Sequence, residues 1–303
     1  MDDVSKLLEK SLRFVSLRLV GLPGYANTRS AKVMIGTEAA DTSIFVNPTV
    51  RLMPKDWSAR FSQVEGLARR VIANASPSME HSVDLPAVLA LRGVSVVAAS
   101  RAAEVEAAVQ AVIDKEFEQA KKEFIAAYEG IIADVQKKIN NAAVWESIKS
   151  KIPTKKALEG RLSLRFDKIP ITFLSEKVNA EASATAQAIF NGIAGAILEE
   201  AGNIQTRLNS EKGRFRLDSF NELKRQMELL KSFSFLTSDE SLAKLEEVER
   251  TMNAMGKDPH TVLNAATAAS SGVAKLFGNT LSALGQSLSS GSELAKRRKI
   301  LAE

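Results

Sequence analysis

The chain has 303 residues, of which 45% are hydrophobic and 25% charged, close to the average of globular proteins. This composition excludes a disordered chain, a collagen-like fibre and a disulfide-stapled miniprotein, and the absence of cysteine excludes thiolate metal sites, thiol nucleophiles and iron–sulfur clusters. The net charge of +5, from 41 Lys and Arg against 36 Asp and Glu, does not by itself indicate a nucleic-acid-binding protein, because affinity for phosphates depends on clustered charge.

The first 85 residues are expected to form a small α+β part. Apolar residues nearly alternate from Leu12 to Leu19, and β-branched runs follow at 32–35 and 43–52, so the first fifty residues are predicted to be rich in β-structure. A short helix is expected after Pro54, with Asp56 as its N-cap.

A long helix is predicted from 100 to 140, because its apolar residues recur at spacings of three or four and form one stripe. The stripe residues are Val105, Val109, Ile113, Phe117, Ala120, Phe124, Tyr128, Ile131, Val135 and Ile139. Forty helical residues span ~60 Å, a length that needs another helix lying along it.

The expected partner is a second helix over 175–209, which has an apolar face and small residues that permit close approach. We therefore predict a mainly helical (α+β) protein with a small N-terminal β-containing part, a long, coiled-coil-like antiparallel helical hairpin and C-terminal helices. The hairpin, its connector and the C-terminal helix pair are expected to occupy 86–258. A membrane-inserting hairpin is the less favoured alternative, because charged and polar residues interrupt each apolar stretch.

The connector between these helices, residues 142–170, is strongly basic. Seven cations face only Glu159 and Asp167 between 149 and 168, a surplus of +5 that equals the net charge of the whole chain. The seven are Lys149, Lys151, Lys155, Lys156, Arg161, Arg165 and Lys168. Three interpretations stay open for them: a solvated loop, a contact with nucleic acid and a contact with an acidic protein partner.

Two shorter helices are predicted next, over 215–231 and from an N-cap at Ser238 to Gly256. Residues 259–303 are rich in Ala, Ser and Gly and are expected to be a tail that is flexible or ordered by a partner. The tail ends in a second basic cluster, formed by Lys296, Arg297, Arg298 and Lys299.

No catalytic constellation is found in the sequence. Phosphate-binding loops, HExxH and GxSxG are absent, and His81 and His260 lack the neighbouring ligands that a metal site requires. We therefore expect no enzyme activity, no cofactor, and no catalytic, cofactor-binding or metal-binding residues.

The order of several segments resembles an uncharacterised family of bacteria, phages and integrative elements. The resemblance covers about residues 10–255 and rests on 61–70 (FSQVEGLARR), 117–129 (FEQAKKEFIAAYE), 161–166 (RLSLRF) and the Leu-rich helix pair around 227–248. Members of that family are often encoded beside a MoxR-like AAA+ ATPase and a von Willebrand-type protein. The resemblance implies these two as partners and implies no catalytic residues.

We therefore expect a non-enzymatic interaction or adaptor protein of a phage or mobile element, working with a protein partner such as an AAA+ machine. A DNA- or RNA-binding accessory protein and a self-assembling phage structural protein are the alternatives, the last of which requires a homo-oligomer. A bacterial cytoplasmic location is expected and membrane contact is not, because the sequence begins MDDVSKLLEK and no stretch of about 20 residues is uniformly apolar.

Overall fold

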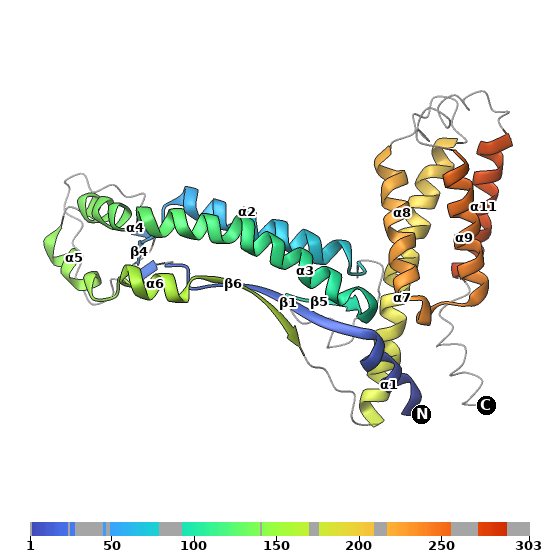
Figure 1. Cartoon of the computed structure of the whole chain (residues 1–303), viewed down its shortest axis with the longest axis horizontal. Helices are drawn as coiled ribbons and strands as arrows, with labels where there is room; N and C mark the ends of the chain where they lie inside the picture. Colours follow the sequence, from blue (N-terminus) through green and yellow to red (C-terminus); the bar gives the residue numbers. More distant parts are fainter. Residues whose placement is uncertain are drawn as a thin grey trace. The chain divides into compact units, whose positions relative to one another are not determined.

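The computed structural model describes residues 2–23, 25–27, 45–46, 49–78, 93–139, 141–169, 176–208, 217–255 and 272–289. Within them the protein is mainly helical with a small amount of β-structure, which confirms the predicted fold class (Figure 1). The chain forms two compact units. Unit 1 comprises 1–15, 72–104 and 168–303, and unit 2 comprises 16–71 and 105–167.

The N-terminal part begins with a helix, α1 (Asp2–Ser11), in the region predicted to be rich in β-structure. Strand β1 (Leu12–Val20) follows and confirms the predicted strand, although its burial does not alternate, because Val15 and Ser16 are buried between Phe14 and Leu17. It lies between β5 (Val94–Ala98), which has no counterpart among the predicted elements, and β6 (Ser163–Ile169) in a three-stranded sheet.

A second, smaller sheet has the order β2-β4-β3 and is antiparallel. Its strands are β2 (Tyr25–Asn27), β3 (Phe45–Val46) and β4 (Thr49–Arg51), with Tyr25 opposite Arg51. The expected run at 32–35 lies outside the described residues.

Unit 2 is built on the long predicted helix, which consists of α3 (Ala102–Val112), a π-helical turn (Ile113–Phe117) and α4 (Glu118–Ile139). All ten residues of its predicted apolar stripe are buried. Helix α2 (Lys55–Asn74) packs on this stripe through aromatic rings, with the centroids of Trp57 and Phe124 5.2 Å apart and those of Phe61 and Phe117 5.8 Å apart. Helix α2 begins before Asp56, so that this residue lies in the first turn and is not the N-cap.

Two short helices complete unit 2, and both lie within the predicted basic connector. They are α5 (Ala142–Lys149) and α6 (Lys155–Arg161). Asn141 caps α5 by accepting a hydrogen bond from the Val144 N–H, and Thr154 caps α6 by accepting one from the Ala157 N–H.

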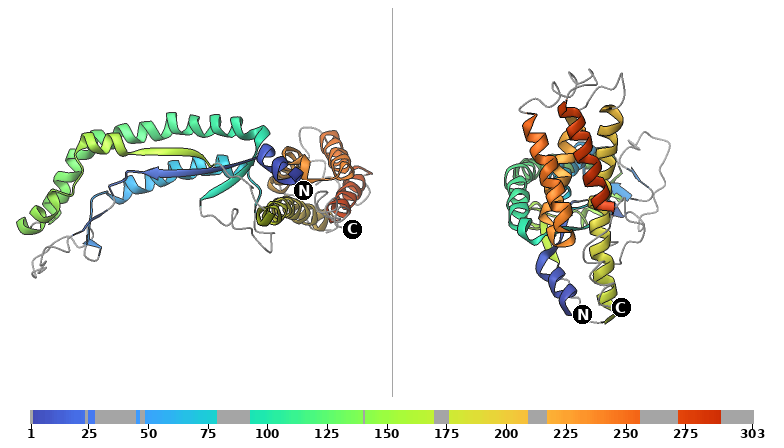
Figure 2. Two further views of the ribbon diagram at one scale, coloured as in Figure 1. Left: turned by 90° about the horizontal axis from the view of Figure 1, so that it is seen from below. Right: turned by 90° about the vertical axis from the view of Figure 1, so that its right-hand side faces the viewer.

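Unit 1 contains a four-helix bundle of α7 (Glu176–Leu208), α8 (Leu217–Ser232), α9 (Asp239–Ala254) and α11 (Gly272–Ser289), shown side by side in the right panel of Figure 2. A short 3-10 helix, η4 (Ser234–Leu236), joins α8 to α9, and another, η2 (Ala99–Arg101), follows β5. The predicted N-cap of α9 is confirmed, because the Ser238 hydroxyl accepts from the Ser241 N–H at 3.2 Å.

Two expectations are corrected by this arrangement. The two long helices do not share a hairpin: the stripe of α3–α4 belongs to unit 2 and is covered by α2, whereas α7 belongs to unit 1 and packs with α8 and α11. Part of the expected tail, residues 272–289, is helix α11 and contributes four fully buried side chains to the bundle core. An apolar stripe at helical spacing fits any complementary stripe, so periodicity does not select the partner.

The division of the chain also differs from the expected boundaries at 85 and 258, because each unit combines segments far apart in sequence. Among the described helices, none has a stretch long and apolar enough to cross a membrane.

Candidate functional site

The net positive charge of the chain lies entirely in unit 2. Unit 2 contains 19 Lys and Arg against 14 Asp and Glu, a net of +5, and unit 1 contains the remaining 22 of each and is neutral. Clustered charge of one sign is what attracts an oppositely charged partner. Unit 2 therefore offers the more favourable surface for an acidic partner.

Within unit 2, exposed cations gather where the end of α4 meets α5, α6 and β6, at the left of Figure 1. We call this group the basic end. Its members are Lys137, Lys138, Lys149, Lys151, Lys155, Lys156, Arg161 and Arg165. Six of them were predicted from the connector; Lys168, the seventh predicted cation, is exposed but falls in unit 1.

An apolar cluster under α5 fixes the direction of Lys149, the one cation on that helix. Val144 and Ile148 are buried against the end of α4 and Leu52, and Lys149 lies outside this apolar face and is exposed to solvent. Its ammonium group lies 3.6 Å from Glu146, and both side chains are more than 60% exposed. Such a pair contributes ~0–1 kcal/mol to stability, so it leaves the lysine available to a partner.

The two lysines of α6 are placed where the helix dipole does not favour them. Lys155 and Lys156 are exposed in its first turn, where the helix dipole disfavours positive charge. Charge at that position lowers helix stability slightly, which is consistent with a role in binding.

The connection between α5 and α6 is anchored to the long helix. The Tyr128 hydroxyl donates to the carbonyl oxygen of Pro153 at 2.9 Å, and burial of the ring raises the pKa of Tyr128 to about 12. Gly21, at the end of β1, lies against the backbone of Arg161 at the end of α6. These two contacts hold α6, and with it three of the cations, in a defined position.

An open hollow adjoins the basic end, beside the start of α2. Its charged lining residues are Arg51, Lys55, Asp56, Asp134 and Lys138, with apolar walls from α4. Sequence reasoning missed the contribution of Arg51 and Lys55, because they lie about a hundred residues before the connector. The Lys137–Lys138 pair at the end of the long helix was the one feature of the sequence that could have indicated that the basic surface extends beyond the connector.

Acidic residues are interleaved with these cations. Lys137 lies 3.9 Å from Asp134, and Arg18 pairs with Asp167 at 2.7 Å. The surface is therefore a mixed one with a positive surplus, and it differs from an uninterrupted track of cations.

The remaining predicted site residues lie elsewhere. Lys296, Arg297, Arg298 and Lys299 are outside the described residues, as are His81 and His260. In the part of the chain that the structure describes, no three His, Cys, Asp or Glu side chains are grouped so that they could hold a metal ion. The expectation that the protein is not an enzyme stays a prediction.

Comparison with known proteins gives one family. A family model described as a protein of unknown function (DUF3150) matches residues 51–276. No curated protein and no solved structure matches the chain.

Proposed function

The chain belongs to the DUF3150 family of proteins of unknown function, and from its own geometry we propose that it is a non-enzymatic adaptor that binds an acidic protein partner through the basic end of unit 2. The observation that carries the proposal is the distribution of charge. The whole net positive charge of the chain lies in unit 2, and eight exposed cations gather around α5 and α6.

The interleaved carboxylates favour a protein partner over a nucleic acid. A phosphate backbone presents regular negative charge and meets Asp134 and Glu146 unfavourably, because like charges repel at short range. The carboxylates of a protein are spaced irregularly and can face the cations alone. Complementary charge of this kind mainly sets association rate and specificity.

The family resemblance suggests which partners to examine first. A MoxR-like AAA+ ATPase and a von Willebrand-type protein, encoded nearby in a phage or mobile element, are the candidates that it implies. They remain candidates, and the proposal requires only that the bound surface be acidic.

The proposal is tested with a charge-reversal variant of the full chain. Changing Lys155, Lys156, Arg161 and Arg165 to Glu is expected to weaken binding of the purified neighbouring gene products by at least about tenfold, since several charge pairs are lost together. The affinity of the unaltered chain is expected to fall as salt is raised.

The matched control reverses four exposed cations elsewhere, Arg70, Lys122, Lys224 and Arg250, and so changes the net charge equally. Equal loss of binding in both variants contradicts a role for the basic end, as does binding that neither variant alters.

Binding of nucleic acid is the second candidate function, and the hollow beside α2 favours it. Arg51, Lys55 and Lys138 outnumber Asp56 and Asp134 there, at the start of a long helix, and helix N-termini attract phosphate groups. Duplex DNA and single-stranded RNA are therefore assayed with the same two variants and with a hollow variant, in which Arg51, Lys55 and Lys138 are changed to Glu. Tighter binding of either nucleic acid than of any protein partner, kept in the control variant and lost in the hollow variant, replaces the adaptor proposal with this one.

A further inference from the structure

Helix α11 completes the bundle of unit 1 with an apolar face. Phe277, Leu281, Leu284 and Leu288 follow a four-three-four spacing and are at most 2% exposed. The helix packs along α9 and α7, and in Figure 2 it lies beside both. Without α11, the apolar surfaces of α7 and α9 would line an open groove.

Few polar interactions connect α11 to its neighbours. Lys275 is the one charged residue between 272 and 289, and none of the ion pairs among the described residues involves this helix. Gln205 on α7 donates to the Ser282 hydroxyl at 2.7 Å and to the Gly278 carbonyl at 3.2 Å, and the hydroxyl oxygens of Ser287 and of Ser241 on α9 lie 3.1 Å apart.

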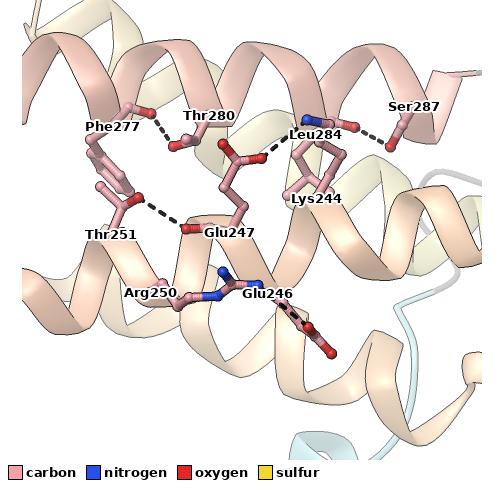
Figure 3. Close-up of polar contacts among 9 residues, drawn as sticks. All are labelled: Lys244, Glu246, Glu247, Arg250, Thr251, Phe277, Thr280, Leu284 and Ser287. Carbon is pink, nitrogen blue, oxygen red and sulfur yellow. Dashed lines mark hydrogen bonds and ion pairs between the residues drawn. The ribbon is translucent and has the colours of Figure 1, made fainter.

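The buried hydroxyls between α9 and α11 are satisfied within their own helices, as Figure 3 shows. Thr280 donates to the Phe277 carbonyl at 2.9 Å and Ser287 to that of Leu284 at 3.1 Å, while on α9 Thr251 donates to the Glu247 carbonyl at 2.9 Å. Separation of the two helices therefore leaves none of these three hydroxyls without a partner.

The sequence of α11 favours the helix only weakly. It contains Gly272, Gly278 and Gly285, together with several Ser, Thr and Asn residues. Packing does not require Gly278, since a Cβ atom there would meet nothing within 4 Å, whereas at Gly285 it would lie 3.3 Å from the Leu198 side chain. A helix of this composition and length depends on its groove for its structure.

The other helices of the bundle have contacts that do not involve α11. Phe233 and Leu236, at the junction of α8 and α9, are fully buried, and Lys231 on α8 pairs with Glu249 on α9. Helix α8 also packs along α7. These contacts hold α9 to α8 when α11 is absent from the groove.

We propose that α11 opens from the bundle while the other three helices stay folded, and that the groove between α7 and α9 then binds an amphipathic helix of a partner protein. The incoming helix carries the pattern of α11: four apolar residues at four-three-four spacing and no charge on that face. The inference rests on the proposed role as an interaction protein and adds a second, apolar binding surface, in unit 1.

The test uses the full chain, which has no cysteine of its own, with Ser241→Cys as the single thiol. The probe is a peptide of residues 272–289 with Gly278→Ala and Ser287→Cys. Because the hydroxyl oxygens of Ser241 and Ser287 lie 3.1 Å apart when the groove is filled, docking of the peptide brings the two thiols together and a disulfide forms under mild oxidation.

Two controls make the result specific. The first is the same peptide with Leu281→Asp and Leu284→Asp, and the second is a host with Asn253→Cys, an exposed position on α9. The Ser241→Cys host and the peptide that keeps both leucines are expected to cross-link at least about tenfold more than either control mixture. The control peptide lacks two leucines that are buried on docking, and the control host has its thiol at a different position of α9. Equal cross-linking in all three mixtures overturns the proposal.

Hydrogen exchange of the unaltered full chain gives an independent measurement. Amides of α11 are expected to exchange faster than those of α7 between 189 and 197, and Gly278→Ala is expected to slow the α11 amides by about fivefold. Exchange of α11 at the rate of α7 overturns the proposal. The groove is apolar, so peptide binding is expected to be unaffected by salt, whereas binding at the basic end is expected to weaken as salt is raised. Failure of the groove proposal is therefore distinguishable from failure of the proposed function.

Discussion

Gly21 and Gly93 both have left-handed backbone conformations, with φ of 84° and 74°, but their surroundings differ. A Cβ atom at Gly21 would lie 2.4 Å from the Arg161 carbonyl oxygen, whereas one at Gly93 would meet nothing within 4 Å. Gly21 is therefore required both by its φ and by the close approach of β1 to the end of α6, and Gly93 by its φ alone.

This difference gives a prediction with an internal control. Gly93→Ala is expected to lower the free energy of unfolding by ~1–2 kcal/mol through backbone strain, and Gly21→Ala by ~2–5 kcal/mol because the backbone at Arg161 must also move. Urea denaturation of the two variants measures both values. Equal losses of unfolding free energy in the two variants would show that the close contact between Gly21 and α6 is absent.

Tyr128 couples the long helix to the basic end and gives a second prediction at this scale. Burial raises its pKa to about 12, so the folded protein holds the phenolic proton more tightly than the unfolded chain, whose tyrosine titrates near 10. The resulting stability is present below about pH 10 and is lost progressively between about pH 10 and 12, amounting to a loss of ~1 kcal/mol at about pH 11.

The protein has two tyrosines, so absorbance titration can resolve them. Tyr128→Phe is expected to remove the transition near pH 12 and to lower stability at neutral pH by ~0.5–1.5 kcal/mol, through loss of the bond to Pro153. Ionisation of both tyrosines near pH 10 in the unaltered protein would contradict the burial of Tyr128.

At the scale of elements, the π-helical turn at Ile113–Phe117 explains how one stripe stays continuous along the whole long helix. The first four residues of the apolar stripe, at 105, 109, 113 and 117, are separated by three successive steps of four residues. In an α-helix each such step turns ~400°, so the stripe would drift by ~120° over these residues. The wider π-turn takes up one extra residue and returns the stripe to the same face.

A pair of deletions tests this interpretation. Removing Lys115, an exposed residue inside the π-turn, is expected to leave a regular α-helix with the downstream stripe in phase, at a loss of ~1 kcal/mol or less. Removing Lys122, exposed in α4, is expected to rotate every later stripe residue by ~100° and to destabilise the core of unit 2 by several kcal/mol. Thermal denaturation followed by circular dichroism compares the two, and similar losses would argue against the π-turn as an extra residue.

At the scale of the whole molecule, each unit has a hydrophobic cluster of its own. The bundle cluster includes Leu223, Leu230 and Leu245 of unit 1, and the cluster around Val144 and Ile148 belongs to unit 2. Both tryptophans, at 57 and 145, are in unit 2. Tryptophan fluorescence therefore reports on unit 2, whereas far-ultraviolet circular dichroism reports on both units.

Separate cores predict separate unfolding. Leu230→Ala, at a fully buried position of α8, is expected to destabilise unit 1 by ~2–5 kcal/mol and to shift the circular dichroism transition, leaving the fluorescence midpoint nearly unchanged. Phe124→Ala in unit 2 is expected to move the fluorescence midpoint instead. Coincident shifts of both signals in either variant would mean that the two units unfold as one.

The sequence by itself determined the properties that are local to an element: the mainly helical class, the long helix with all ten stripe residues, the start of α9 at Ser238 and most cations of the basic end. Periodicity and capping express the geometry of a single helix, so they can be recognised without knowing what surrounds it. Only the tertiary structure decided which stripes meet. It paired α3–α4 with α2, brought α11 into the bundle, formed β5 and set Arg51 and Lys55 beside Lys138, because these contacts depend on shape complementarity between segments far apart in the chain.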